Sequence, residues 1–297
     1  MTGKQPSRMG SASPSRGKYP RLAPDRIQVI ASLAETVAET HCPNLPVQPS
    51  VILKAKRLTI SHEAYGDTFD GLLEHRDGQF HVFCNLDRVG SPDSARARFT
   101  LAHELGHFFI DEHRNALRAG ADVHGSQTEY LSGNPIEVEA DLFASHLLLP
   151  TGPFLRAVGK RGPSLESVIE IANEFGTSLS STAIRFAGVD VHPCVVIRWA
   201  PEGYAWKWLS PQAHRSRFWS TIEDIEAVPE DSATGTVLKG GATSPGAVVC
   251  RGTTAAAWFP WVPEGASRNI ILREQAVSLG RFGAMTMLFP DGGRFPD

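Results

Sequence analysis

Two histidines four residues apart, with a glutamate directly after the first, are the residues of this chain best suited to catalysis. They lie in the run His103-Glu104-Leu105-Gly106-His107. On an α-helix, positions 103 and 107 share one face and can bind one tetrahedral metal ion, while Glu104 lies beside them. A carboxylate in that position can take a proton from a metal-activated water without binding the metal itself. If the segment is helical, the pattern predicts a zinc hydrolase with Glu104 as its general base.

The residues around this run favour a helix. Residues 91–94 contain serine and aspartate oxygens for capping and a proline suited to a first helical turn. Apolar residues then form a broad face between positions 99 and 110. Gly106 within such a helix costs about 1 kcal/mol relative to alanine, so we expect a neighbouring backbone or a substrate to approach closely there.

A second helix, predicted between Pro135 and Pro150, carries two acidic residues on one face. Glu137 and Asp141 are four positions apart in a mostly apolar run. A pair of carboxylates facing a core requires a cation nearby. Glu137 can supply a third metal ligand and leave the fourth position to water, and Asp141 can accept the second N–H of a ligating histidine and fix its tautomer. Glu139 is expected to point into solvent.

These blocks resemble the ImmA/IrrE-type metallopeptidases. The similarity covers roughly residues 50–187 and is carried by RFTLAHELGH (98–107), EVEADLFA (137–144) and LLLP (147–150). It implies a zincin-like fold and a bacterial or phage zinc endopeptidase with one zinc ion per chain. Such an enzyme cleaves, or otherwise inactivates, a helix-turn-helix transcriptional repressor, often one encoded nearby. The resemblance therefore implies a role in transcription regulation and in stress response.

The resemblance also implies a role for each motif residue. By that analogy His103, His107 and Glu137 bind the zinc ion, and Glu104 is the general base. Family members commonly have asparagine where this chain has Asp141. An aspartate keeps the role of orienting a histidine but leaves its own protonation open.

His113 is the alternative third ligand. The run from His103 to His113 approximates the three-histidine motif of metzincin proteases, in which a glycine lets the chain turn sharply towards the metal. Ile110 stands in the place of that glycine, and a β-branched residue is poorly suited to a positive φ. We therefore favour Glu137 over His113, whose plainer role is that of a surface histidine beyond a helix end.

Peptide hydrolysis also needs a hydrogen-bond donor to the oxyanion that forms on the scissile carbonyl. Tyr130, His124 and His146, together with His113, lie in a suitable stretch of the chain. The sequence does not choose among them, and each is also compatible with a structural or exposed position.

Length and composition predict a soluble, cytoplasmic protein with no membrane partner, and the mixture of predicted helices and strands indicates an α+β fold. The chain has 297 residues, of which 41% are hydrophobic, and no apolar run approaches the ~18 residues needed to cross a bilayer. No secretory leader is recognisable. The four cysteines have neither zinc-ribbon nor redox spacing, so we expect reduced thiols at Cys42, Cys84, Cys194 and Cys250.

Three regions are expected along the chain. Residues 1–22 hold five basic and no acidic residues among many Ser, Gly and Pro, which predicts a disordered basic tail. Residues 23–188 are expected to form the zincin-like metallopeptidase domain, which includes a helix-turn-helix-like pair at 164–186. Residues 189–297 are expected to form a C-terminal α/β domain of unknown role, although some relatives carry a sensor-like domain there.

Further elements are expected within these regions. Strands are predicted near 51–60 and 79–85 in the first domain, and a helix near 212–225 in the second. Short alternating runs predict five strands in the C-terminal domain, at 194–199, 204–209, 247–251, 269–273 and 284–289.

Charge weighs against DNA as the main ligand. Without the tail, 24 basic residues face 32 acidic ones, and the second helix of the pair at 164–186 carries chiefly hydroxyl side chains. Direct DNA binding is disfavoured but left open. Besides a peptidase that cuts a repressor, two alternatives stay open: a non-proteolytic protein that sequesters the repressor, and a DNA-binding regulator on a decayed peptidase fold.

Overall fold

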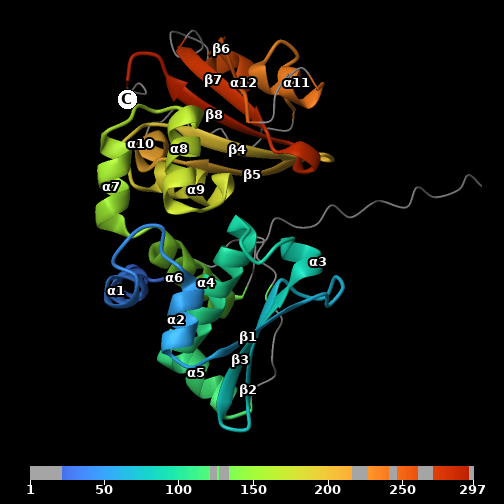
Figure 1. Ribbon diagram of the computed structural model, residues 1–297. Coiled ribbons are helices and arrows are strands. Elements are labelled where there is room, and N and C mark those ends of the chain that lie inside the picture. Colours follow the sequence, from blue (N-terminus) through green and yellow to red (C-terminus); the bar gives the residue numbers. More distant parts are fainter. Residues whose placement is uncertain are drawn as a thin grey trace, which may run out of the picture.

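A computed structural model describes residues 22–120, 126, 134–215, 227–240, 246–259 and 270–293 of the chain. It shows a mixed α+β fold with two parts, each built on its own sheet (Figure 1). The first part holds the helices that carry the motif residues, and the second contains the C-terminal sheet. Apart from Leu22, the basic tail predicted at 1–22 lies outside the described residues. Among the described residues, no helix is both long and apolar enough to span a membrane.

The N-terminal helix α1 (Pro24–His41) packs against α6 (Pro135–Leu148), more than a hundred residues later in the chain. Proline in the first turn of α1 lacks only an N–H that a helix start leaves unpaired anyway. The inner face of α1 buries Ile30, Ala34 and Val37, as their helical spacing predicts.

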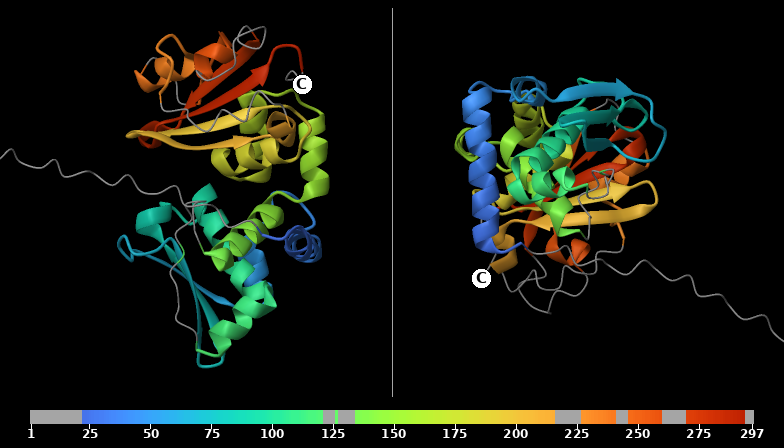
Figure 2. Two further views of the ribbon diagram at one scale, coloured as in Figure 1. Left: turned by 180° about the vertical axis from the view of Figure 1, so that it is seen from behind. Right: turned by 90° about the horizontal axis from the view of Figure 1, so that it is seen from below.

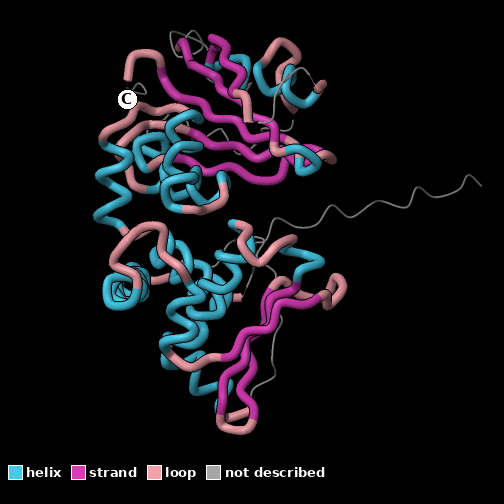
Figure 3. Tube along the Cα trace, in the orientation of Figure 1, coloured by secondary structure: helices cyan, strands magenta, loops and turns pink. Residues whose placement is uncertain are grey.

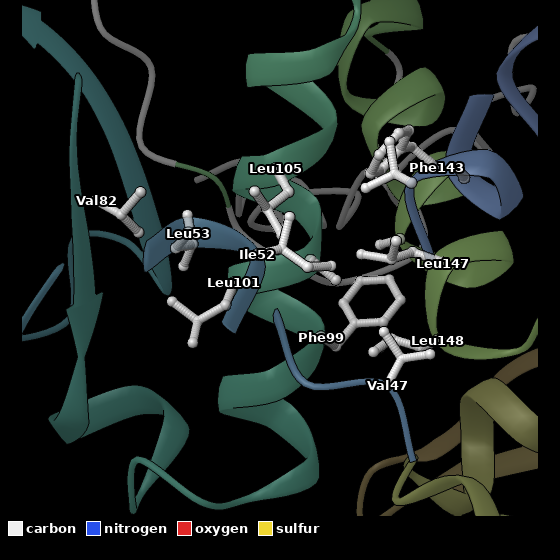
Figure 4. Close-up of a cluster of buried hydrophobic side chains, with 14 of the residues drawn as sticks. Val47, Ile52, Leu53, Val82, Phe99, Leu101, Leu105, Phe143, Leu147 and Leu148 are labelled. Atoms are coloured by element: carbon white, nitrogen blue, oxygen red, sulfur yellow. The ribbon is translucent and has the colours of Figure 1, made fainter. Parts of the chain in front are cut away.

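The strand predicted at 51–60 is wrong over its first half. Helix α2 (Pro49–Ala55) occupies that stretch, and strand β1 is only Thr59–Glu63. Val51 and Ile52 favour a strand by propensity alone. However, the proline at position 49 begins a helical turn, and the helix buries Ile52 against the helix that bears the histidines (Figure 4). Packing therefore overrides local propensity here.

A three-stranded sheet covers one side of the histidine-bearing helix. Its strands β1, β2 (Gly71–Arg76) and β3 (Gln79–Asn85) have the order β1-β3-β2, with β1 parallel and β2 antiparallel to β3. Asp77 and Gly78, both with positive φ, form the tight turn between β2 and β3. The order leaves β2 at one edge of this sheet. The strand predicted at 79–85 is confirmed.

Both motif helices form where the sequence predicts them. Helix α4 (Ala95–Phe109) is capped by the hydroxyl of Ser94, which accepts a hydrogen bond from the N–H of Ala97. Helix α6 is capped by the side chain of Asn134 and has proline in its first turn. Between them lies an apolar core, shown in Figure 4, to which α4 contributes Phe99, Leu101 and Leu105 and α6 contributes Phe143, Leu147 and Leu148.

Two short helices flank α4 in the chain, α3 (Leu86–Val89) and α5 (Asp111–Arg118). Helix α4 ends at Phe109, and Ile110 after it has an extended backbone, with φ of −73° and ψ of 115°, which lets α5 start at once in a new direction. The turn therefore needs no glycine at this position.

The helix pair predicted at 164–186 is confirmed as α8 (Leu165–Phe175) and α9 (Leu179–Gly188), preceded by α7 (Thr151–Gly159). Gly176 ends α8 in the left-handed conformation, with φ of 63°. The apolar faces of these helices share one core with residues of the C-terminal sheet, among them Val196, Met285 and Met287. The division of the chain after residue 188 stays a prediction.

The C-terminal part is a five-stranded antiparallel sheet with the order β5-β4-β8-β7-β6 (Figure 1). Figure 3 shows its strands in magenta, apart from those of the first sheet. All five predicted strands are confirmed, as β4 (Val195–Ala200), β5 (Gly203–Leu209), β6 (Val248–Thr254), β7 (Ile271–Ser278) and β8 (Ala284–Pro290).

A different set of helices covers each face of this sheet (Figure 2). Helices α7 to α9 contribute to the core on one face, whereas the core on the other face includes residues of α10 (Pro211–Arg215), α11 (Ala233–Leu238) and α12 (Ala255–Trp258). Of the helix predicted near 212–225, only the part up to residue 215 lies within the described residues, and that part is helical.

Candidate metal centre

The close packing of α4 on α6 brings the histidine motif against the acidic helix. Gly106 makes this approach possible, because a Cβ atom at that position would lie 3.0 Å from the Cα of Ala140 and 3.2 Å from its carbonyl oxygen. The glycine expected to admit a neighbouring backbone therefore faces the backbone of α6. His103 and Glu137 lie about one turn before this contact on their helices, and His107 and Asp141 directly follow it.

Three side chains converge at this helix contact. The Nε2 atoms of His103 and His107 are 3.0 Å apart. The carboxylate of Glu137 lies 3.1 Å from Nε2 of His103 and 3.6 Å from Nε2 of His107. One ligand atom of each residue lies within 4.8 Å of the other two, and both histidines are largely buried. The structure thus gathers the three residues that the sequence nominated as ligands.

Asp141 holds His103 from its other side. Its Oδ1 atom is 2.9 Å from Nδ1 of His103, and both side chains are buried. A proton on Nδ1 is assigned from this contact, and it leaves the Nε2 lone pair directed at His107 and Glu137. With His103 in that tautomer, its Nε2 atom and the carboxylate of Glu137 are both acceptors, and only a second proton on His103 would join them by a hydrogen bond. Two imidazole nitrogens and one carboxylate with an open fourth position are the donor set of a catalytic zinc site, so these residues fit zinc.

The electrostatics of the cluster agree with a cation site. Burial disfavours the charged form of His103, but hydrogen bonds to Asp141 and Glu137 outweigh it and raise the pKa well above its ordinary value. Burial and the nearby charge of His103 lower the pKa of His107 well below its ordinary value. The cluster therefore attracts one positive charge and rejects a second proton, and a divalent ion would compete with the proton on His103.

Glu104 is buried beside the donor cluster but is not one of its members. Its Oε1 atom accepts a hydrogen bond of 2.6 Å from the hydroxyl of Ser126. Burial raises the pKa of Glu104 to about 7, although the charge of His103 and the bond from Ser126 act in the opposite direction. A carboxylate with a pKa near neutrality is suited to accepting and returning a proton.

His113 lies next to the cluster but outside the donor group. Its ring centroid is 5.2 Å from that of His107, and its Nε2 atom is 3.1 Å from a carboxylate oxygen of Glu139. Glu139 was expected in solvent, and that expectation is wrong. Its side chain is only 13% exposed and accepts two hydrogen bonds from Arg26 of α1, at 2.8 and 2.6 Å. His113 is likewise buried rather than a surface residue.

The remaining oxyanion candidates do not join the cluster. His146, near the end of α6, bonds to Glu35 of α1 at 3.0 Å and to Arg185 of α9 at 3.1 Å. These partners hold it nine residues beyond Glu137, which is about 13 Å along the helix. His124 and Tyr130 lie outside the described residues.

Sequence reasoning missed Ser126 and the pairing of Glu139 with Arg26. Arg26 and Glu139 are separated by 113 positions and Ser126 and Glu104 by 22, and neither pair belongs to a motif with fixed spacing. The one signal in the sequence is that Glu139 lies among apolar residues of α6, where a carboxylate needs a positively charged partner.

Comparison with known proteins supports the same reading of the residues. Residues 91–187 match the family described as "IrrE N-terminal-like domain", peptidase family M78. No curated protein sequence matches the chain. A solved structure titled "Mycobacterium tuberculosis transcriptional regulator" has a TM-score of 0.57 at 15% identity, over 90% of this chain and 91% of that chain. At this identity the likeness is one of fold. The segment 91–187, which carries α4, α6 and all three donor residues, matches the M78 peptidase family, as the resemblance predicted.

Proposed function

We propose that this protein is a zinc-dependent endopeptidase that acts on a helix-turn-helix transcription regulator in the cytoplasm. The observation that carries the proposal is the convergence of His103, His107 and Glu137 within 4.8 Å, with the buried carboxylate of Glu104 beside them. Membership of residues 91–187 in a peptidase family supports the same chemistry.

Each residue of the site has a distinct task in this proposal. His103, His107 and Glu137 would hold the zinc ion, which when bound would supply a Lewis acid that lowers the pKa of water towards about 7. Glu104 accepts the proton of the attacking water and returns it to the leaving amine. Asp141 keeps Nδ1 of His103 protonated, so that Nε2 stays free to bind the metal.

A protein regulator is the substrate class that the comparisons favour. The family is one of peptidases, and the protein of similar fold is titled a transcriptional regulator. A direct role in reading DNA receives less support, because the guanidinium of Arg185 on α9 is tied to His146 and to Thr151 and so is not free to reach a base.

Zinc content and cleavage test the proposal together. We expect the purified protein to bind one zinc ion per chain, measured by plasma mass spectrometry. In cells that produce the native protein, we expect new N-termini within a helix-turn-helix repressor. These should be missing from cells that produce Glu104→Gln, a variant that keeps the three ligands and so should keep its zinc. The cleavage is then repeated with purified repressor.

Three outcomes would revise the proposal. Cleavage by Glu104→Gln at the native rate would reject Glu104 as the base. A zinc-loaded native protein that binds the repressor without cutting it would be a sequestering protein instead. Zinc loss in His113→Ala but not in Glu137→Gln would show that His113, and not Glu137, is the third ligand.

A further inference from the structure

Ser126 is buried at the edge of the first sheet, in a position that no motif predicts. Its side chain and backbone are only 2% exposed. Residue 126 pairs with β2 in an antiparallel bridge: the N–H of Asp70 donates to its carbonyl oxygen at 2.8 Å, and its own N–H donates to the carbonyl oxygen of Gly71 at 2.9 Å. Ser126 is thus fixed by its backbone before its side chain makes any contact.

The hydroxyl of Ser126 reaches the carboxylate proposed as the base. Its Oγ atom lies 2.6 Å from Oε1 of Glu104 and 3.0 Å from the carbonyl oxygen of Gly71. A distance of 2.6 Å falls in the range of about 2.5–2.7 Å that is typical of hydroxyl bonds to ionised carboxylates, which are roughly twice as strong as neutral ones. A hydroxyl has only one hydrogen to donate. An ionised carboxylate is a stronger acceptor than a carbonyl oxygen, so the hydrogen goes to Glu104.

The surroundings leave Glu104 little freedom to move away from this bond. A Cβ atom built on Gly71 would lie 2.7 Å from Oε1 of Glu104 and would also collide with the methyl group of Thr100. The carboxylate therefore occupies the space that any side chain at position 71 would fill. The backbone of β2 forms one wall of this space and α4 forms the other.

The anchor of Ser126 is itself held rigidly. Asp70, whose N–H binds Ser126, has a fully buried side chain. Its carboxylate accepts a hydrogen bond of 2.6 Å from Nε of Arg88 and one of 2.8 Å from Nη2 of Arg96. Arg88 lies on α3 and Arg96 on α4, so these two bonds fix the start of β2 relative to the helix that bears Glu104.

We propose that Ser126 is a positioning residue for Glu104. Helices α4 and α6 position the three metal-binding residues, whereas the hydrogen bond that holds the carboxylate of Glu104 comes from Ser126, outside both helices. The hydroxyl of Ser126, fixed on β2, selects the rotamer that the base needs. Catalytic groups must be held within about 0.5 Å of their working position, and a glutamate, with three side-chain torsions, needs a partner to be held so closely. This inference rests on the proposed peptidase function.

The test compares Ser126→Ala, Glu104→Gln and the double variant with the native protein, using a peptide that spans the cleaved bond of the repressor. Ser126→Ala should keep one zinc ion per chain and lose between about tenfold and a hundredfold in kcat, as expected when a catalytic group is misplaced. The KM should change less than about twofold, because Ser126 acts through Glu104 rather than on bound peptide. Ser126→Thr, which keeps the hydroxyl, should restore most of the lost kcat.

A second measurement does not depend on activity. In the metal-free protein, the melting-temperature shifts of Ser126→Ala and Glu104→Gln should not add in the double variant, because both act on the same contact: alanine removes the donor, and glutamine replaces the charged acceptor by a weaker neutral one. Ser167→Ala serves as the control, since Ser167 is a buried serine of α8 far along the chain from the site. Its shift should add to that of Glu104→Gln, and its kcat should equal that of the native protein.

Several results would overturn the proposal. Additive melting shifts would show that the contact does not exist. If the native protein cleaves the peptide and Ser126→Ala cleaves it equally fast, the positioning role fails while the peptidase function stands. A faster Ser126→Ala would show that Ser126 blocks the site instead of arranging it. If zinc-loaded native protein cleaves nothing, the peptidase function fails and the positioning role fails with it.

Discussion

Replacing Gly106 by alanine should weaken both the fold and the metal site. The added Cβ would lie 3.0 Å from Cα and 3.2 Å from the carbonyl oxygen of Ala140, and 3.2 Å from Cβ of Phe143. The first two atoms belong to the backbone of α6, so the clash is relieved only if α4 and α6 move apart by a few tenths of an ångström. Helix propensity favours alanine by about 1 kcal/mol, whereas overpacking a tight core costs about 1–3 kcal/mol. We expect a net loss of about 1 kcal/mol, or a fall in melting temperature on the order of 2 °C.

The same displacement should reach the metal site. The two histidines lie on α4, and Glu137 and Asp141 lie on α6, so any separation of the helices lengthens every contact between the two sets. We expect zinc affinity to fall about tenfold, which is the lower end of the effect of losing an orienting contact. Thermal unfolding of the metal-free protein and competition with a chromophoric chelator measure the two effects separately.

Gly159→Ala is the matched control for this experiment. Gly159 ends α7 on the exposed surface, and a Cβ there would meet no atom within 4 Å. Alanine should therefore stabilise the protein by up to about 0.5–1 kcal/mol and leave zinc affinity unchanged. If Gly106→Ala proves as stable as this control and binds zinc like the native protein, the close approach of α4 to α6 is not needed for the site.

Three further predictions concern other contacts. Asp141→Asn keeps an acceptor for Nδ1 of His103 but removes the charge, so zinc affinity should fall by about ten- to a hundredfold in chelator competition; equal affinity would contradict the orienting role. Burial raises the pKa of Cys194 to about 12, whereas Cys250 is exposed, so iodoacetamide should modify Cys250 in the folded protein and Cys194 only after unfolding, as read by mass spectrometry. Burial and the charge of Arg185 lower the pKa of His146, so the folded state binds this proton less readily than the unfolded state and stability falls as the pH drops below 6.5. His146→Gln should accordingly lose less melting temperature than the native protein between about pH 7.5 and pH 5.5, and equal losses would contradict the assignment.

The parts of the site that follow from spacing within one helix could be predicted from the sequence. His103 and His107 share a face because they are four residues apart, and the same holds for Glu137 and Asp141. The contact between the histidine face and the acidic face follows from chemistry, because a buried pair of carboxylates needs a cation nearby and the histidines can bind one. Capping residues and prolines at the helix ends support the two helices themselves.

The parts that depend on long-range contacts could not be predicted. Glu139 lies two positions from Glu137, which predicts a solvent-exposed position on α6, but Arg26 of α1 hydrogen-bonds to its carboxylate and makes burial there favourable. In the same way, nothing near Ser126 marks it as a neighbour of Glu104. For α2, local propensity favoured a strand, and only its packing partner decided otherwise.

The core shared by α7 to α9 and the C-terminal sheet bears on where the protein divides. The first core contains residues from α1 to α6, ending at Leu148, whereas Leu149 already belongs to the core that α8 and α9 build with the sheet. A chain cut after residue 188 would expose Phe175 and Phe186, which are fully buried in that core. Apolar burial on this scale is the main driving force for folding a domain. We therefore propose that the metal-binding unit ends near Leu148 and that the helix pair folds with the C-terminal sheet. In that arrangement α6 carries Glu137 near its first turn, while His146 in its last turn contacts Arg185 of α9, so one helix joins the metal centre to the C-terminal unit.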